Sequence, residues 1–116
     1  MTTIESVRSF LAEFKGKLSI WNVFYRDDRG KNSQALLDLE ITPRFRTEIL
    51  EKLTPKDFSQ GPIEEVLYNG SDMWVFGKVI KGKEVYIKIT LGSENSRVVC
   101  ISFHIAEHTM NYPFKI

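Results

Sequence analysis

Apolar and polar positions alternate most regularly in the second half of the chain. Three runs rich in β-branched and aromatic residues lie there, at 73–80, 84–91 and 97–104. Two short polar stretches that contain glycine, 81–83 and 92–96, separate these runs. Such runs favour strands, and short glycine-containing connections favour tight turns between neighbouring strands. The pattern therefore predicts a three-stranded antiparallel meander.

The middle run predicts that this sheet has one apolar and one polar face, because successive side chains of a strand point to opposite sides. One face carries Val85, Ile87, Ile89 and Leu91, and the other carries Glu84, Tyr86, Lys88 and Thr90. In the third run we expect Val99, Ile101 and Phe103 to face the core. His104 then lies on the polar face of the sheet.

The first half of the chain predicts a helix followed by a hairpin. Residues 3–15 place apolar side chains at helical spacing behind Thr3, a good N-cap, and Gly16 is expected to end the helix. Residues 18–26 and 34–41 are expected to form two strands that a polar, glycine-containing turn joins. Alternatively, the Ala-Leu-Leu sequence of the second segment begins a helix.

A second helix is expected after Thr42, because threonine supplies an N-cap and Pro43 fits the first helical position. The same pair of residue types at Thr54 predicts one short turn. Residues 63–67 form a brief apolar piece, either helix or strand, before the meander. The tail after residue 107 carries several apolar side chains and is expected to pack against the body of the protein.

The expected order of elements is α-β-β-α-(turn)-β-β-β, which predicts an α+β fold in a single domain, residues 1–116. A hairpin and the meander then make a mostly antiparallel sheet, and two helices pack on one side of it. A chain of 116 residues is long enough to bury a sizeable core.

Composition narrows the class of protein without identifying it. The chain is 42% hydrophobic and 27% charged, and its net charge of +1 does not indicate a strong general affinity for nucleic acid. The single cysteine, Cys100, excludes an internal disulfide and is expected to be a small packing residue. No apolar run reaches the roughly 18–20 residues of a membrane span. The first residues lack a signal-peptide pattern, so we expect a cytoplasmic protein without a membrane partner.

One short motif suggests a metal site. His104-Ile-Ala-Glu107-His108 matches the H-x-x-E-H of inverted zinc peptidases. That motif needs a helix, on which residues four apart lie on one face and can share a metal ion. In a strand, residues four apart are ~13 Å apart. We therefore expect no metal site in this stretch, and no cofactor.

Tyr86, Lys88 and His104 form a better candidate site. RNA cleavage without a metal needs a base for the ribose 2′-hydroxyl, an acid for the 5′-oxygen leaving group, and cations around the phosphate. Histidine suits either proton-transfer role, lysine supplies positive charge, and tyrosine can stack on a base or share a proton. An ordinary solvated sheet face has the same composition, so the pattern leaves both interpretations open.

Lysines gather around the first turn of the predicted meander, namely Lys78, Lys81, Lys83 and Lys88. Most such clusters serve solubility, but beside an RNA site they attract phosphates. Lys56 and Gln60 lie in the segment that enters the sheet and are further RNA-binding candidates.

Four stretches in order suggest a family. They are LTPKDF at 53–58, Trp74 at the start of a strand, EVYIKIT at 84–90 and VCISFH at 99–104. In residue types and spacing, roughly residues 50–107 resemble the MqsR-type toxins of bacterial type II toxin–antitoxin modules, relatives of the RelE fold. Tyr86 matches the functional tyrosine of that family.

At three other positions this chain differs from the family pattern. His104 stands where the family's closing strand carries a functional lysine, and Gln60 stands where the family has a lysine. Val75 replaces a glutamine that follows the tryptophan of the strand. A histidine at position 104 is chemically a better general acid or base than lysine.

The resemblance implies a cytoplasmic endoribonuclease of RelE-like fold that cleaves mRNA, on or off the ribosome, without a metal. It also implies a cognate antitoxin with a helix-turn-helix that silences the enzyme. We expect His104 to transfer protons, with Tyr86 as its partner or as a base-stacking residue. Lys88 and Lys78 are expected to bind the phosphate. The competing hypothesis is a non-catalytic interaction domain that uses the same sheet for a protein partner.

Overall fold

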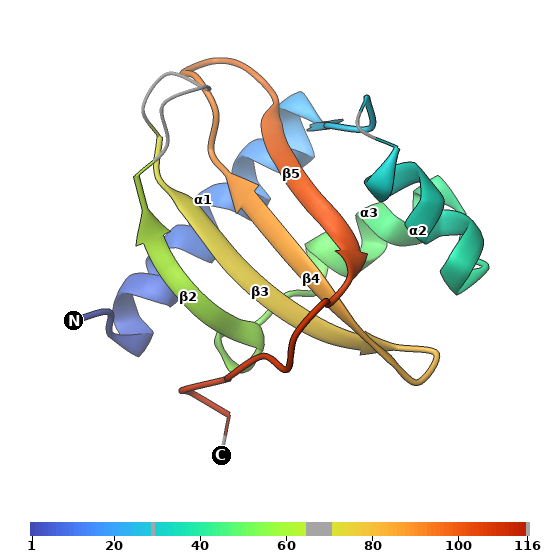
Figure 1. Ribbon diagram of the computed structural model, residues 1–116. Helices are drawn as coiled ribbons and strands as arrows, with labels where there is room; N and C mark the ends of the chain where they lie inside the picture. Colours follow the sequence, from blue (N-terminus) through green and yellow to red (C-terminus); the bar gives the residue numbers. More distant parts are fainter. Residues whose placement is uncertain (29, 65–70, 116) are drawn as a thin grey trace.

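The computed structural model of the chain describes residues 1–28, 30–64 and 71–115. Within them, five strands form one sheet, accompanied by three α-helices and one short 3-10 helix (Figure 1). The strand order is β1-β5-β4-β3-β2, with β1 parallel to β5 and the other neighbours antiparallel. The predicted α+β class and the mostly antiparallel sheet are therefore confirmed.

The predicted meander is present as β3 (Met73–Ile80), β4 (Lys83–Thr90) and β5 (Val98–Ile105). Strands β3 and β4 pair along their whole length, from Met73 opposite Thr90 to Ile80 opposite Lys83. The two residues between them, Lys81 and Gly82, have φ angles of 51° and 81°. Two left-handed residues in a two-residue loop match the right-handed twist of the flanking strands.

Helix α1 (Ile4–Trp21) begins where the sequence predicts but runs past Gly16. Thr3 and Ser6 form the N-terminal capping box. The expected stop at Gly16 is wrong, because the apolar spacing continues beyond it and buries Leu18 in the core. Burying a leucine is worth about 1.5–3 kcal/mol, more than the roughly 1 kcal/mol that a glycine costs inside a helix. Asn22, with a φ of 74°, ends the helix instead.

The predicted N-terminal hairpin is wrong. Strand β1 (Val23–Tyr25) pairs in parallel with β5, and the expected second strand is helix α2 (Lys31–Leu39). Its buried residues, Asn32, Ala35 and Leu39, recur at helical spacing, and Leu37 between them is 72% exposed. The alternative prediction, a helix beginning at the Ala-Leu-Leu sequence, is closer to the structure.

The middle of the chain follows the sequence prediction more closely. Helix α3 (Pro43–Glu51) begins at Thr42, whose hydroxyl accepts a hydrogen bond of 3.1 Å from the Phe45 amide. The short turn is the 3-10 helix η1 (Pro55–Asp57), which leads into edge strand β2 (Phe58–Ile63). Of the brief piece expected at 63–67, residues 65–67 lie outside the described ranges.

The core lies between α1 and one face of the sheet. Buried α1 side chains include Val7, Phe10 and Phe14. From the sheet, the core contains Phe76, Val85, Ile87, Ile89, Val98, Cys100 and Phe103. Helices α2 and α3 close the β5 side of this layer, and the other sheet face has no helix over it among the described residues (Figure 1). No helix in the described ranges is long and apolar enough to cross a membrane.

Cys100 is a packing residue, as predicted, and Trp74 packs against the core as well. The Trp74 ring stacks on Phe10 with 4.6 Å between ring centroids. Cys100 is fully buried, and this burial raises the pKa of its thiol to about 12. The other tryptophan, Trp21, is 43% exposed at the end of α1.

A β-bulge in β5 changes the faces predicted for that strand. Cys100 pairs with Ile89 and Ser102 with Lys88, so Ile101 is an extra residue without a partner on β4. Val98 and Cys100 therefore join the core together with Phe103, in place of the expected Val99 and Ile101. Beyond the bulge the predicted alternation holds.

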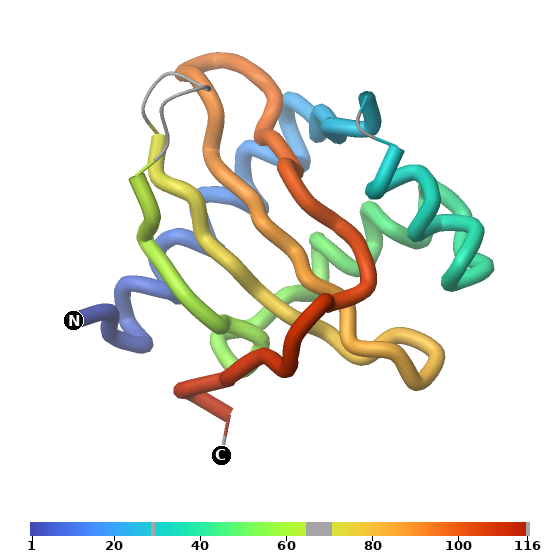
Figure 2. The backbone as a smooth tube through the Cα atoms, in the orientation of Figure 1, coloured from blue at the N-terminus to red at the C-terminus, as the bar shows by residue number. Residues whose placement is uncertain are grey.

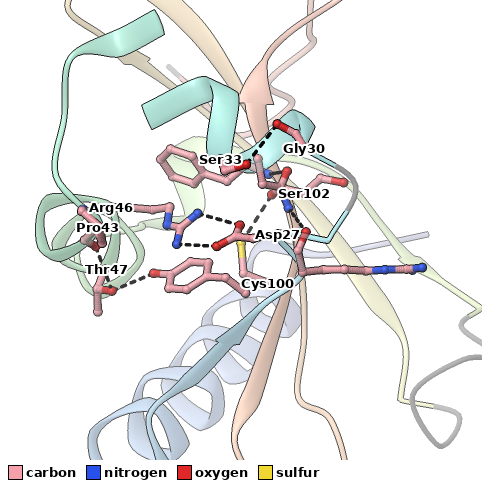
Figure 3. A network of polar contacts seen from close by, with 12 residues as sticks. Asp27, Gly30, Ser33, Pro43, Arg46, Thr47, Cys100 and Ser102 are labelled. Carbon is pink, nitrogen blue, oxygen red and sulfur yellow. Dashed lines mark hydrogen bonds and ion pairs between the residues drawn. The ribbon is translucent and has the colours of Figure 1, made fainter. Parts of the chain in front are cut away.

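A polar network joins α3 to the end of β1 (Figure 3). The guanidinium of Arg46, 3% exposed, donates two hydrogen bonds to Asp27, of 3.0 and 3.2 Å. It also lies 3.5 Å from the centroid of the Tyr25 ring, and the Tyr25 hydroxyl is 2.7 Å from that of Thr47. Burial, the largest cause, raises the pKa of Tyr25 to about 12. The network fixes α3 against β1 and the segment that follows it.

The tail packs against the body, as predicted. In Figure 2 it runs from the end of β5 across the lower ends of β3 and β2. The Tyr112 hydroxyl donates a hydrogen bond of 2.7 Å to Glu84, and the Phe114 ring stacks on Phe58. Gly77 allows this close approach, because a Cβ at that position would lie 2.2 Å from the Tyr112 hydroxyl oxygen. The tail thus covers the lower part of the open sheet face.

Candidate active site

Tyr86, Lys88 and His104 lie together on the open face of the sheet. Tyr86 is directly opposite His104 in the β4–β5 ladder, and their rings stack with 5.3 Å between centroids and 15° between planes. The Lys88 ammonium is 5.8 Å from the centroid of the Tyr86 ring. Phe103 and His104 both follow the bulge at Ile101, so they still alternate as predicted. Phe103 faces the core and His104 lies on the open face, as expected.

The three side chains line a cavity of about 660 Å³. Ser59 and Gln60 of β2 form one wall, and Lys31 and Asn32 of α2 contribute to another. The tail lines the cavity with residues Glu107, His108, Thr109, Met110 and Asn111. This volume lies within the roughly 300–1,000 Å³ of typical ligand sites. Residues of β2, α2 and the tail therefore surround the three side chains that the alternation of the meander predicts as a site.

The protonation of two of these groups follows from their surroundings. Burial raises the pKa of Tyr86, so its phenol keeps the proton at neutral pH and can donate it. The Nδ1 of His104 lies 3.1 Å from the carbonyl oxygen of Ile105. A carbonyl only accepts hydrogen bonds, so this contact requires a proton on Nδ1. In the neutral ring, Nε2 is then the nitrogen that can accept a proton.

The described lining of the cavity carries more positive than negative charge. Lys31 and Lys88 face one carboxylate, Glu107, and the neighbouring His108 can add positive charge when it is protonated. Lys31 donates a hydrogen bond of 3.1 Å to Glu107, and this bond is the main reason that the pKa of Glu107 is lowered. Both partners are well exposed, so the pair is weak and Lys31 can exchange it for another anion.

The other RNA-binding candidates, except Gln60, lie outside the cavity. Lys78 sits on the helix-covered face of the sheet, 3.3 Å from Asp57. Lys81 donates to the Glu40 carbonyl, and Lys83 is exposed beside it at the β3–β4 turn. Lys56 is exposed on η1. Val75 is fully buried opposite Lys88, so the family's glutamine has no polar replacement at that position.

The H-x-x-E-H stretch does not form a helix. Strand β5 ends at Ile105, between His104 and the other two residues of the motif. Among the described residues, no group of three or more His, Cys, Asp or Glu side chains is placed to hold a metal ion. Glu107 and His108 instead reach the cavity from the start of the tail.

Sequence reasoning missed the contribution of α2. Lys31 and Asn32 lie in a segment that was expected to be a turn, and their wall of the cavity exists because the chain forms a helix there. A local signal was present, since Asn32, Ala35 and Leu39 are spaced as one helix face. The position of this helix beside β5 depends on tertiary contacts that the local pattern does not encode.

Comparisons of the chain with protein families, curated proteins and solved structures return no match. The geometry of the cavity is therefore the basis for any functional assignment.

Proposed function

We propose that this chain is an mRNA endoribonuclease of the MqsR/RelE type, a toxin that cleaves RNA without a metal and is neutralised by a cognate antitoxin. The observation that carries the proposal is the cross-strand pair of Tyr86 and His104, stacked on the open sheet face beside Lys88. The resemblance of residues 50–107 to these toxins, carried by Tyr86 and the strands around it, agrees with that geometry.

In the proposed reaction, Nε2 of His104 takes the proton from a ribose 2′-hydroxyl. The 2′-oxygen attacks the adjacent phosphorus, the bond from phosphorus to the 5′-oxygen breaks, and Tyr86 gives its proton to that leaving oxygen. The products are a 2′,3′-cyclic phosphate and a 5′-hydroxyl. Lys88 stabilises the negative charge on the phosphate, and Gln60 contacts the same strand from β2.

The lysines outside the cavity contact RNA only at a distance from the cut in this proposal. Lys81 and Lys83 project from the β3–β4 turn, and Lys56 lies on η1. Lys78 would first have to release Asp57. Their contribution is to attract the phosphate backbone, an effect that weakens with salt.

The competing proposal is a non-catalytic interaction domain that uses the same sheet face. It is favoured by Val79, which lies on that face and is 64% exposed. Growth arrest on expression, relieved by the product of a neighbouring gene with a helix-turn-helix, supports the toxin. Harmless expression supports the interaction domain.

The direct test is cleavage of mRNA by the purified protein, with and without ribosomes. We expect His104→Ala to lower the cleavage rate by about 10²–10⁴-fold, the usual contribution of general acid–base catalysis. Tyr86→Phe keeps the ring stack and removes the phenolic proton, so lost activity indicates proton transfer and retained activity indicates stacking alone. No cleavage in either setting, or full cleavage by the His104 variant, contradicts the proposal.

A further inference from the structure

A second cavity adjoins the proposed active site on its α2 side. It has a volume of about 450 Å³ and is lined by Gln34 and Asp38 of α2. Lys31, His104 and Glu107 line both cavities. The proposed proton-transfer residue therefore lies at the boundary of two neighbouring spaces, and the Lys31–Glu107 ion pair lies beside it.

This arrangement suits two successive nucleotides of a single RNA strand. A phosphate between the two would lie at the boundary, next to His104. The Lys31–Glu107 pair is solvent-exposed on both sides, 57% and 63%, and such pairs contribute little to stability. A phosphate can therefore replace Glu107 as the partner of Lys31.

Gln34 and Asp38 give the second cavity groups that can read a base. The amide of Gln34 donates a hydrogen bond of 3.0 Å to Asp38, which holds the carboxylate in place. A carboxylate only accepts hydrogen bonds, so it pairs with an exocyclic amino group and not with a carbonyl. Cytosine, adenine and guanine carry such an amino group, whereas the N3–H donor of uracil lies between two carbonyl oxygens that repel a carboxylate.

We propose that the second cavity is the base-recognition subsite next to the cut, in which Asp38, oriented by Gln34, selects a base with an exocyclic amino group and Lys31 binds the intervening phosphate. The proposal rests on the proposed function, because it names the substrate contacts of the same site. Proteins read single-stranded RNA mainly through exposed base edges, as such a subsite requires.

The test uses a random-sequence RNA pool and sequencing of the 5′-hydroxyl ends after partial cleavage. We expect the unmodified protein to disfavour uracil by about tenfold at one fixed position next to the cut. Asp38→Asn supplies an amide donor in the same shape and should abolish or reverse that preference while total cleavage continues. Asp28→Asn makes the same chemical change at a residue that lines neither cavity and should leave the preference unchanged.

A binding measurement tests Lys31 without cleavage. An RNA with 2′-O-methyl groups cannot undergo the proposed reaction, because its 2′-oxygen carries no proton. We expect Lys31→Gln to reduce the slope of log affinity against log salt by about 0.7, the value for one phosphate contact on a single strand. Lys52→Gln, an exposed lysine outside both cavities, is the matched control and should leave the slope unchanged.

The outcomes separate the two proposals. If the Asp38 variant cleaves with the original preference, the subsite is wrong and the ribonuclease proposal stands. If Lys31→Gln and Lys52→Gln both keep the original slope of log affinity against log salt, Lys31 does not bind the phosphate. If the unmodified protein cleaves no RNA with or without ribosomes, the proposed function fails and the subsite fails with it.

Discussion

The side chain of Asn32 closes the β-bulge at Ile101. Its amide donates hydrogen bonds to the carbonyl oxygens of Ile101, at 3.0 Å, and Arg26, at 2.7 Å. Its own oxygen accepts a hydrogen bond of 2.9 Å from the Phe103 amide. Asn32 is 4% exposed, so these hydrogen bonds are shielded from bulk water. One side chain of α2 thus supplies hydrogen-bond partners to backbone groups of β5 at the bulge, where the β4–β5 ladder is interrupted.

This contact determines which face His104 occupies. Side chains of a strand alternate, so a bulge of one residue moves every following side chain to the opposite face. Upstream of Ile101, Cys100 points into the core, and downstream His104 pairs with Tyr86 on the open face. Without the bulge, either Cys100 or His104 would have to change faces.

We predict that Asn32→Ala lowers the free energy of unfolding by at least about 2 kcal/mol, because buried backbone groups lose their partners. Urea unfolding followed by circular dichroism measures this change. Ser33→Ala, the next residue of the same helix, removes an exposed hydrogen bond and should stay within about 0.5 kcal/mol of the original protein. Equal effects of the two substitutions would contradict the role of Asn32.

The sequence predicted the meander because its signals are local. The two-residue turn at Lys81 and Gly82 and the alternation of β4 require no knowledge of other segments. The pairing of β1 with β5 and the bulge at Ile101 depend on contacts between distant residues, such as Asn32 with Phe103. For the same reason, the sequence indicated Tyr86, Lys88 and His104 but missed the α2 wall of the cavity.

We predict that Gly77→Ala displaces the tail from the sheet. The new methyl group would lie 2.2 Å from the Tyr112 hydroxyl oxygen and 2.9 Å from the Met110 sulfur. Both side chains must then move, and the Tyr112–Glu84 hydrogen bond is lost. Faster amide exchange and faster proteolysis in residues 107–115 measure this displacement.

A matched control for that substitution is Gly16→Ala. Gly16 lies within α1, and a Cβ there meets no atom within 4 Å. Alanine is favoured over glycine inside a helix by about 1 kcal/mol, so this variant should be more stable and keep its tail protected. An unchanged tail in the Gly77 variant would show that the gap above β3 is not needed for tail packing.

We predict that Arg46→Lys lowers the free energy of unfolding by about 2 kcal/mol or more, because lysine can neither donate two parallel hydrogen bonds to Asp27 nor stack as a plane on Tyr25. Arg44→Lys is the control, since Arg44 is 90% exposed and pairs with Glu48 across one helical turn. That variant should change stability by less than about 0.5 kcal/mol. Similar losses in both variants would contradict a special role for the buried guanidinium.

We predict that stability falls between pH 9 and pH 10 because of Cys100. Its thiol has an ordinary pKa of 9.0, which burial raises to about 12 in the folded protein. Below pH 9 both states keep the proton, so the thiol adds no pH dependence. Above pH 9 the unfolded chain releases the proton and the folded protein retains it, so rising pH favours unfolding. The limiting slope is about 1.4 kcal/mol per pH unit.

Unfolding by urea on both sides of pH 9 measures this slope, and Cys100→Ala should remove it at some cost in stability from the smaller side chain. Tyr25→Phe is the comparison, because Tyr25 has an ordinary pKa of 10.0 that is raised to about 12. Its contribution begins only above pH 10, so the Tyr25 variant should keep the slope that the Cys100 variant loses. A slope that survives Cys100→Ala between pH 9 and pH 10 would assign the alkaline loss of stability to another group.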